Sequence, residues 1–235
     1  MPGSPMQHEI VHGPAFALLR IKLASGETLD AEAGAMVTRS EGVDMSVRLN
    51  ASRRAGLLGK IGALFIALVR RFIGGETFFI NQFSAPSGGE ITFAPSLSGA
   101  IAHRRIEGDR LILQAGAYLA SAGNVDLRLR WGGLRALLSR EGLFFLEASG
   151  QGDLFFSSYG GVEAIPVRGS YVVDTGHMVA FEGALDFRIR APGGGAMGFL
   201  ASGEGLVCEF SGEGTVYLQS RNVSALVSWI TPYLP

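Results

Sequence analysis

Three times the chain repeats one stretch, seen most clearly in Ala115-Gly116-Ala117-Tyr118-Leu119 leading to Val125-Asp126-Leu127-Arg128-Leu129-Arg130-Trp131. The other copies lie at residues 33–37 with 43–49 and at residues 175–179 with 185–190. In each copy a glycine precedes an aspartate by ten residues, as in Gly34 to Asp44, Gly116 to Asp126 and Gly176 to Asp186. Self-similarity of this kind is typical of repeat architectures. We therefore predict three related units.

Each copy also predicts a strand, because apolar and polar residues alternate in it. Leu127 and Leu129 fall on one side of the stretch, and Asp126 and Arg128 fall on the other. A period of two indicates a half-buried strand with one face in water. Upstream of each copy another strand is predicted, at residues 16–23, 99–106 and 162–167. Turns at 25–27, 107–109 and 168–170 are predicted to end these strands. Further along each copy, glycine turns are predicted at 88–90, 150–153 and 212–214.

The pattern as a whole predicts an all-β protein of three tandem β-sandwich-like repeats, with about five short strands in each. The predicted boundaries are residues 6–95 for the first repeat, 96–158 for the second and 159–220 for the third. A short C-terminal helix is predicted within residues 221–235, where Asn222 is placed to cap it and Pro232 to end it.

The first repeat carries an extra segment at about residues 53–73. Its apolar residues have helical spacing and arginine pairs flank it, so we predict an amphipathic helix. This helix would either lie on a membrane surface or be buried, inside the protein or between subunits. Anionic lipid would attract its cations. The candidate interaction residues are Arg53, Arg54, Leu57, Ile61, Leu64, Phe65, Leu68, Arg70, Arg71 and Phe72.

Composition restricts the classes of function. Charged residues are 17% of the 235 residues and the formal net charge is −1, so a general field for nucleic acid phosphates is not expected. The single Cys208 and the lack of a secretory pattern at the N-terminus favour a cytoplasmic protein. No apolar run reaches the roughly 18 to 20 residues that cross a bilayer.

Several motifs together resemble a known family. They are the duplicated Ala-Gly-x-Met/Tyr-Val/Leu pattern at 33–37 and 115–119, the arginine-flanked segment that runs into Gly74-Gly75-Glu76-Thr77-Phe78-Phe79-Ile80, and Phe93-Ala94-Pro95 before Ser98-Gly99. From about Met6 to Pro235 the chain resembles the family of unknown function that includes the fungal altered-inheritance-of-mitochondria protein of the inner membrane. The resemblance implies a fold similar to the subunit of the trp RNA-binding attenuation protein, present three times in a pseudo-threefold arrangement. It implies no established reaction, and the fungal relative suggests organisation of membrane complexes.

The equivalent aspartates allow two interpretations. A threefold arrangement could bring Asp44, Asp126 and Asp186 together as a metal site, since carboxylates are preferred ligands of hard cations. The alternative, which we favour, is that each aspartate pairs on the wet face of its strand with an arginine two or four residues along. The corresponding arginines are Arg48, Arg128 and Arg188.

The sequence predicts no catalytic centre and no cofactor. His8, His12, His103 and His177 occur in unrelated contexts, and Cys208 lies in an apolar strand where a thiol is usually an inert core residue. The glycine clusters lack the Gly-Lys-Ser/Thr ending of a phosphate loop.

We therefore expect a non-catalytic scaffold or interaction module that forms a homo-oligomer and has a membrane surface or a membrane protein as its other partner. Such a protein would be cytoplasmic or peripheral at the inner face of the membrane. The alternative is a protein that binds a small ligand or RNA in the clefts between repeats, by analogy of fold. An enzyme would need a polar cluster that the sequence does not display.

Overall fold

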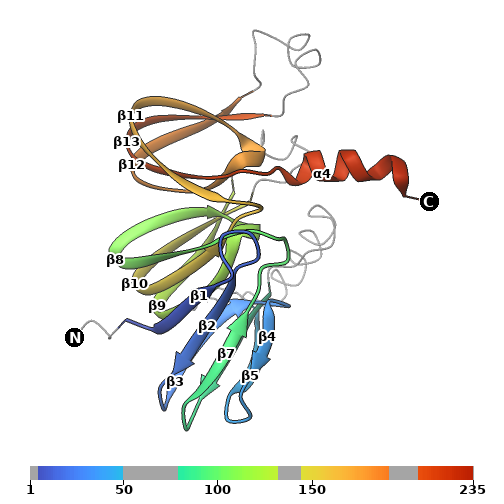
Figure 1. The fold of residues 1–235 in the computed structure, drawn as a ribbon. Coiled ribbons are helices and arrows are strands. Elements are labelled where there is room, and N and C mark those ends of the chain that lie inside the picture. Colours follow the sequence, from blue (N-terminus) through green and yellow to red (C-terminus); the bar gives the residue numbers. More distant parts are fainter. Residues whose placement is uncertain (1–4, 50–78, 132–143, 191–205, 235) are drawn as a thin grey trace, which may run out of the picture.

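The computed structural model describes residues 5–49, 79–131, 144–190 and 206–234, and strands dominate it (Figure 1). Its elements in the first part of the chain are β1 (Gln7–Val11), β2 (Leu18–Leu23), β3 (Glu27–Glu32), β4 (Met36–Arg39), β5 (Asp44–Leu49), β6 (Phe79–Ala85) and β7 (Gly89–Phe93). The turn predicted at 25–27 joins β2 to β3. The all-β prediction is confirmed.

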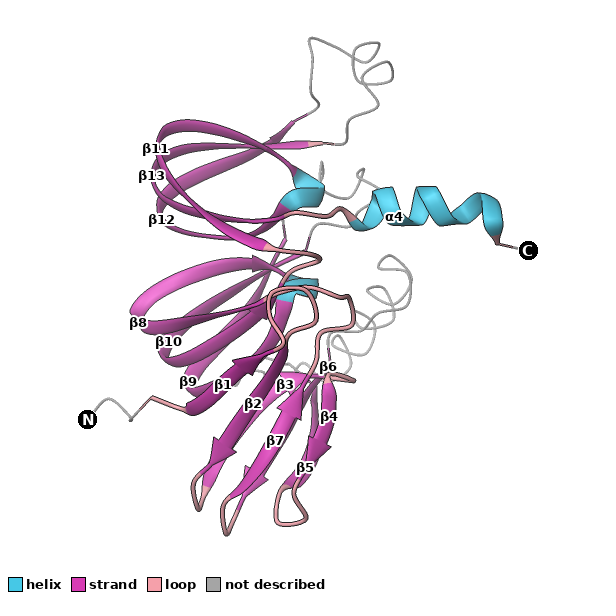
Figure 2. Ribbon diagram, in the orientation of Figure 1, coloured by secondary structure: helices cyan, strands magenta, loops and turns pink. Residues whose placement is uncertain are grey.

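The rest of the described chain consists of longer strands and a short helix. The elements are β8 (Ile101–Gln114), the 3-10 turn η1 (Ala115–Ala117), β9 (Tyr118–Trp131), β10 (Phe144–Ser157), β11 (Val162–Asp174), η2 (Thr175–His177), β12 (Met178–Arg190), β13 (Val207–Gln219), α4 (Val223–Ile230) and η3 (Thr231–Tyr233). The predicted strands at 43–49, 125–131 and 185–190 are confirmed in β5, β9 and β12. The C-terminal helix is confirmed as well, and Figure 2 shows it projecting away from the sheets.

All of these strands pair antiparallel and form two sheets. One sheet has the order β1-β2-β7-β4, and the other has the order β11-β13-β12-β8-β10-β9-β3-β6-β5. In the second part of the chain β10 lies between β8 and β9, and β13 lies in the same way between β11 and β12. The repeat itself, its pseudo-threefold arrangement and the predicted boundaries stay predictions.

The turns predicted inside residues 101–219 are wrong. Residues 107–109, 150–153, 168–170 and 212–214 lie within continuous strands of 13 or 14 residues that bend instead of ending (Figure 1). Glycines with positive φ allow the bend, since L side chains rarely adopt that conformation. A Cβ at Gly150 (φ 110°) would overlap the carbonyl oxygen of Asn124, and one at Gly212 (φ 120°) would overlap that of Ala184. The ladder therefore continues through the bend.

Short ladders join the parts of the long sheet. β12 pairs with β8 at only three positions, between Ala180 and Leu113, Phe181 and Ile112, and Glu182 and Leu111. β3 and β9 likewise pair at three positions, ending with Leu29 opposite Ala122 and Ala31 opposite Ala120. Beyond the β8–β12 ladder, residues of β8, β10, β12 and β13 line an open cleft between the two groups of strands.

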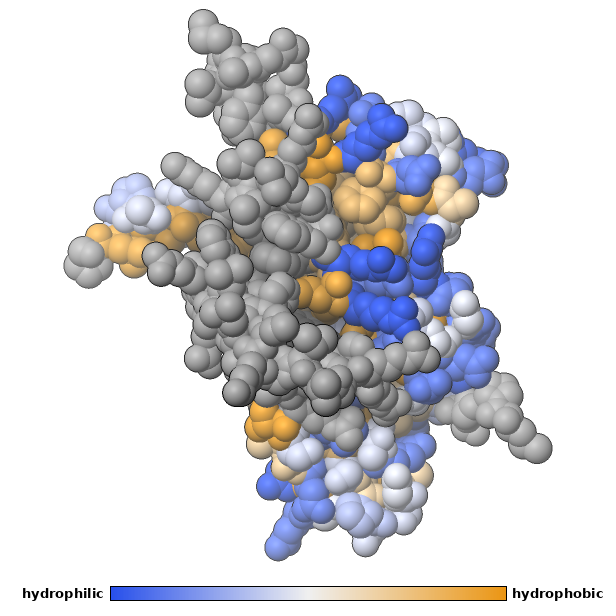
Figure 3. Space-filling view, turned by 180° about the vertical axis from the view of Figure 1, so that it is seen from behind, coloured by the Kyte–Doolittle hydropathy of each residue, from blue (hydrophilic) through white to orange (hydrophobic). Residues whose placement is uncertain are grey.

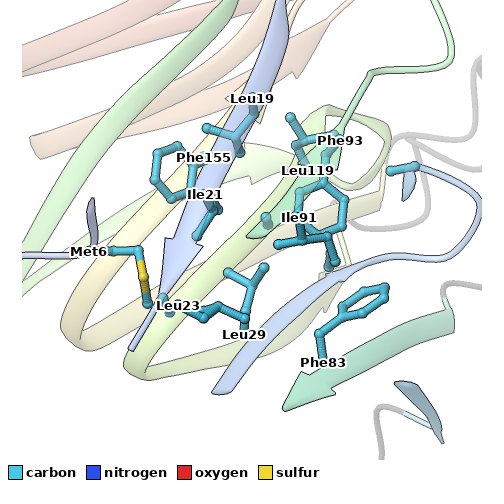
Figure 4. Close-up of a cluster of buried hydrophobic side chains, with 14 of the residues drawn as sticks. Met6, Leu19, Ile21, Leu23, Leu29, Phe83, Ile91, Phe93, Leu119 and Phe155 are labelled. Carbon is cyan, nitrogen blue, oxygen red and sulfur yellow. The ribbon is translucent and has the colours of Figure 1, made fainter. Parts of the chain in front are cut away.

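Three clusters of buried apolar side chains form the core. The first lies between the two sheets and includes Leu19, Ile91 and Phe93, together with Leu119 and Phe155 from β9 and β10 (Figure 4). The other two clusters include Ile106, Leu111, Tyr118, Leu146 and Phe156, and Phe145, Met178, Phe181, Phe210 and Val216. Each such side chain contributes roughly 1.5 to 3 kcal/mol when fully buried. Because the first cluster takes residues from β9 and β10, it fastens the N-terminal strands to the middle of the long sheet.

The predicted alternation of buried and exposed residues holds only in part. Val43 is buried, but Met45 and Val47 on β5 are 47% and 67% exposed. The reason is that β5 is an edge strand that pairs only with β6, so its apolar face extends past the core.

Candidate functional site

Side chains at the end of the long sheet hold the start of α4. Asn222 accepts a hydrogen bond from the backbone N–H of Ala225 at 3.2 Å, which caps the helix, and its amide donates to Asp174 at 3.5 Å. Gly176 lies so close that a Cβ there would overlap the Asn222 side chain. The glycine of the third copy therefore allows the helix to begin against η2.

The backbone before the helix is held in the same way. The side-chain amide of Gln219 donates to the Gly176 carbonyl at 2.8 Å and accepts from the Tyr159 backbone N–H at 2.9 Å. Nδ1 of His177 donates to the Gln219 carbonyl at 2.8 Å. His177 thus has a structural role, positioning the chain that leads into α4.

The helix itself contains no buried residue, although most of its side chains are apolar. Its outer end and the following turn present Val227, Trp229, Ile230, Tyr233 and Leu234, which we call the C-terminal tip. Trp229 is 67% exposed and Tyr233 is 76% exposed, and their rings lie 6.0 Å apart. Viewed from behind, the projecting helix carries a band of apolar residues (Figure 3). Exposed apolar residues gathered in this way mark an interaction surface more often than scattered ones do.

A second candidate is an open cleft of about 630 Å³ between β8 and β10 on one side and β12 and β13 on the other. It lies where the short β8–β12 ladder ends. Arg104 on β8 reaches across it, donating from Nε to Glu182 at 2.9 Å and pairing with Asp109. The Tyr217 hydroxyl donates to the same Glu182 at 2.7 Å. This cleft lies between two groups of strands, and whether such clefts separate repeats and bind a ligand stays a prediction.

The charges of this cleft largely satisfy one another. Burial and the hydrogen bond to Glu182 raise the pKa of Tyr217 to about 12. Burial lowers the pKa of Arg104, but the hydrogen bond with Glu182 and the charges of Glu182 and Asp109 together outweigh that effect, so the pKa is raised. Arg104 and Arg110 face Asp109, Glu147 and Glu182 along the lining. The cleft therefore has no excess of cations with which to hold a polyanion.

A third candidate is a cluster of hydrogen-bonded polar side chains that lies between the two sheets. The carboxylate of Asp153 on β10 accepts from the Met6 backbone N–H at 2.9 Å, from Nε2 of His103 at 2.8 Å and from Arg105 at 2.6 Å. The His8 ring packs on His103 with centroids 4.3 Å apart. This cluster fastens the chain before β1 to β8 and β10. No sequence pattern indicates this cluster, because residues 6, 103 and 153 meet only in the folded chain.

The three equivalent aspartates lie on β5, β9 and β12, which are not neighbours in the sheet. Asp126 pairs with Arg128 at 2.9 Å on the exposed face, as the favoured interpretation predicts. Among the residues that the structure describes, no three histidine, cysteine, aspartate or glutamate side chains come together as a metal site. Within the described residues, Asp44 and Asp186 therefore lack the further histidine, cysteine or carboxylate ligands that a metal site would need.

The remaining predicted residues have simpler outcomes. Cys208 is fully buried on β13 in the third core cluster. The candidate interaction segment at 53–73, with Arg53, Arg54, Leu57, Ile61, Leu64, Phe65, Leu68, Arg70, Arg71 and Phe72, lies outside the described residues. The helix α4 agrees with the C-terminal helix predicted from the sequence, to which no function was attached. The sequence does contain a pattern that could have indicated an interaction surface there, since residues 222–235 contain two large aromatic residues and no charged side chain.

Within the described ranges, no helix is both long enough and apolar enough to span a bilayer.

Comparisons with known proteins agree with this architecture. A family model described as "Mitochondrial biogenesis AIM24" matches residues 8–221. An uncharacterized protein of Streptococcus pyogenes serotype M6 is 30% identical over 238 residues, which cover 100% of this chain and 94% of that protein. The crystal structure of a Streptococcus pyogenes protein is similar with a TM-score of 0.80 and 29% identity, covering 97% of this chain and 100% of that one.

Proposed function

This chain belongs to the family described as mitochondrial biogenesis AIM24, and from its structure we propose that it is a non-catalytic interaction module whose β body presents the C-terminal tip to a partner. One observation carries the proposal. α4 contains no buried residue, and large apolar side chains of α4 (Val227 and Trp229) and of the following η3 (Tyr233) are more than half exposed. Leaving such side chains in water is unfavourable by roughly 25 cal/mol for each Å² of apolar surface. A partner that covers the tip would recover that free energy.

The attachment of α4 supports the same proposal. Asn222, Gln219 and His177 hold the base of the helix to η2, so the tip stands at a defined place relative to the sheets. A positioned helix loses less conformational freedom on binding than a loose tail does. The β body then serves as a scaffold, and the expected homo-oligomer stays a prediction.

The test compares the full chain with a variant that carries Trp229→Ser and Tyr233→Ser. In gentle cell fractionation with chemical cross-linking, the parent chain should be recovered in larger assemblies or with membranes, and the variant should be recovered mainly as free chain. Circular dichroism must show the same β content for both. If both chains fractionate alike, the tip is not the docking surface and the proposal fails.

The cleft beside Arg104 supports a second candidate function, binding of a small polar ligand. The observation in its favour is that Tyr217, Glu182 and Arg104 meet at an open cleft of about 630 Å³. A ligand that binds only the folded chain must raise its melting temperature. A thermal screen of small zwitterionic and hydroxylated compounds tests this, with Glu182→Gln as the variant in which any shift should disappear.

A further inference from the structure

We propose that the partner of the C-terminal tip is the interfacial region of a phospholipid bilayer, into which Trp229, Tyr233 and Leu234 insert. This inference rests on the proposed function and names the kind of partner. Three features of α4 and η3 favour lipid over a second protein surface: their lack of charged side chains, their aromatic residues and their small size.

Charge is the first feature. From Asn222 to Pro235 no side chain is charged, and Arg221 stands exposed immediately before the helix. Protein interfaces usually surround an apolar centre with a polar rim that makes hydrogen bonds across the contact. Among the polar side chains here, the Thr231 hydroxyl already donates to the Val227 carbonyl at 2.6 Å. A tip without charged side chains and with a cation at its base matches the polarity change from hydrocarbon to headgroups.

The aromatic residues are the second feature. Trp229 and Tyr233 are one helical turn apart, and their rings lie 6.0 Å from each other on the exposed surface. Tryptophan and tyrosine are enriched at membrane interfaces, because each combines an apolar ring with a polar group that stays near the headgroups. Figure 1 shows that this end of the chain is the part of α4 farthest from the sheets. The tip can therefore reach a flat surface before the β body touches it.

Size is the third feature. α4 has 8 residues, which makes it about 12 Å long at roughly 1.5 Å per residue. Two copies packed along so short a helix would bury on the order of 600 Å² in total, well below the roughly 1,200 Å² of stable protein interfaces. A bilayer sets no such minimum, because each apolar group that enters it contributes separately.

Flotation with vesicles of pure phosphatidylcholine tests the inference on the full chain. Zwitterionic lipid is used because it offers no net charge to the arginine-flanked segment at 53–73. The Trp229→Ser, Tyr233→Ser variant should lose at least about tenfold in partitioning. A Phe16→Ser variant is the matched control, because Phe16 is an aromatic residue that is 73% exposed on the loop between β1 and β2. This control should float like the parent chain.

Light scattering of the same proteins without lipid separates the two proposals. Flotation that depends on the tip supports both. A dimer that depends on the tip, without flotation, overturns the lipid inference and leaves the proposed function standing. Flotation that the double substitution does not reduce also overturns the inference, since another surface then binds the lipid. If neither flotation nor a dimer depends on the tip, the lipid inference fails, and the proposed function fails too if the cell fractionation is also unchanged by the double substitution.

Discussion

Replacement of Asp153 by alanine should strongly destabilise the fold. The Asp153 side chain is 3% exposed and accepts hydrogen bonds from Met6, His103 and Arg105. Alanine removes the acceptor, so the Met6 N–H and Nε2 of His103 lose the group that satisfies them. The substitution also breaks the link between the chain before β1 and the strand β10.

The magnitude follows from burial. Breaking a buried charged pair by removing one partner costs about 3 to 5 kcal/mol, because the remaining group stays desolvated. Folded domains have a total stability of roughly 5 to 15 kcal/mol. For a chain of this length each kcal/mol lowers the melting temperature by roughly 2 to 4 °C, so the expected decrease is about 6 to 20 °C.

Urea denaturation and thermal melting of the parent chain and Asp153→Ala measure this loss. Hydrogen exchange adds a local test, since the amides of β1 should lose protection more than those of β13. The matched control is Asp126→Asn, whose side chain is 51% exposed and pairs with an Arg128 that is 61% exposed. Exposed pairs of this kind contribute about 0 to 1 kcal/mol. If Asp153→Ala costs no more than Asp126→Asn, the reasoning about the buried carboxylate is refuted.

Three further predictions concern the bend, the cleft and the helix cap. Gly212→Ala should cost about 2 to 4 kcal/mol in urea denaturation, because its φ is positive and a Cβ would overlap neighbouring backbone. Gly26→Ala, where φ is positive but the space is open, should cost only about 1 kcal/mol; equal losses would contradict this account. Because the folded pKa of Tyr217 is raised to about 12 from 10.0, the unfolded chain loses that proton first and stability should fall between pH 10 and 12. Tyr217→Phe should lessen this fall, and an unchanged pH profile would show that the hydroxyl contributes nothing. Asn222→Ala should remove the cap of α4 at a cost of about 1 kcal/mol of helix stability, detected as faster hydrogen exchange at Ala225; unchanged exchange would show that the cap is unimportant.

Local sequence patterns predicted three of the strand segments and the C-terminal helix correctly. Alternation of apolar and polar residues located β5, β9 and β12, and a capping residue with a later proline located α4. These signals are local, because a strand period or a helix cap depends on residues close together in the chain. The exposed Asp126–Arg128 pair could be predicted for the same reason.

Other features follow only from the folding of the whole chain. Whether Gly150 and Gly212 end a strand or bend it depends on the backbone of the neighbouring strand, which lies against each of them. The meeting of Met6, His103 and Asp153 depends on how the N-terminal strands pack on β8 and β10. The exposure of Trp229 and Tyr233 depends on where α4 leaves the sheet. Residues far apart in the chain produce each of these features, and a sequence pattern records only the neighbours of each residue.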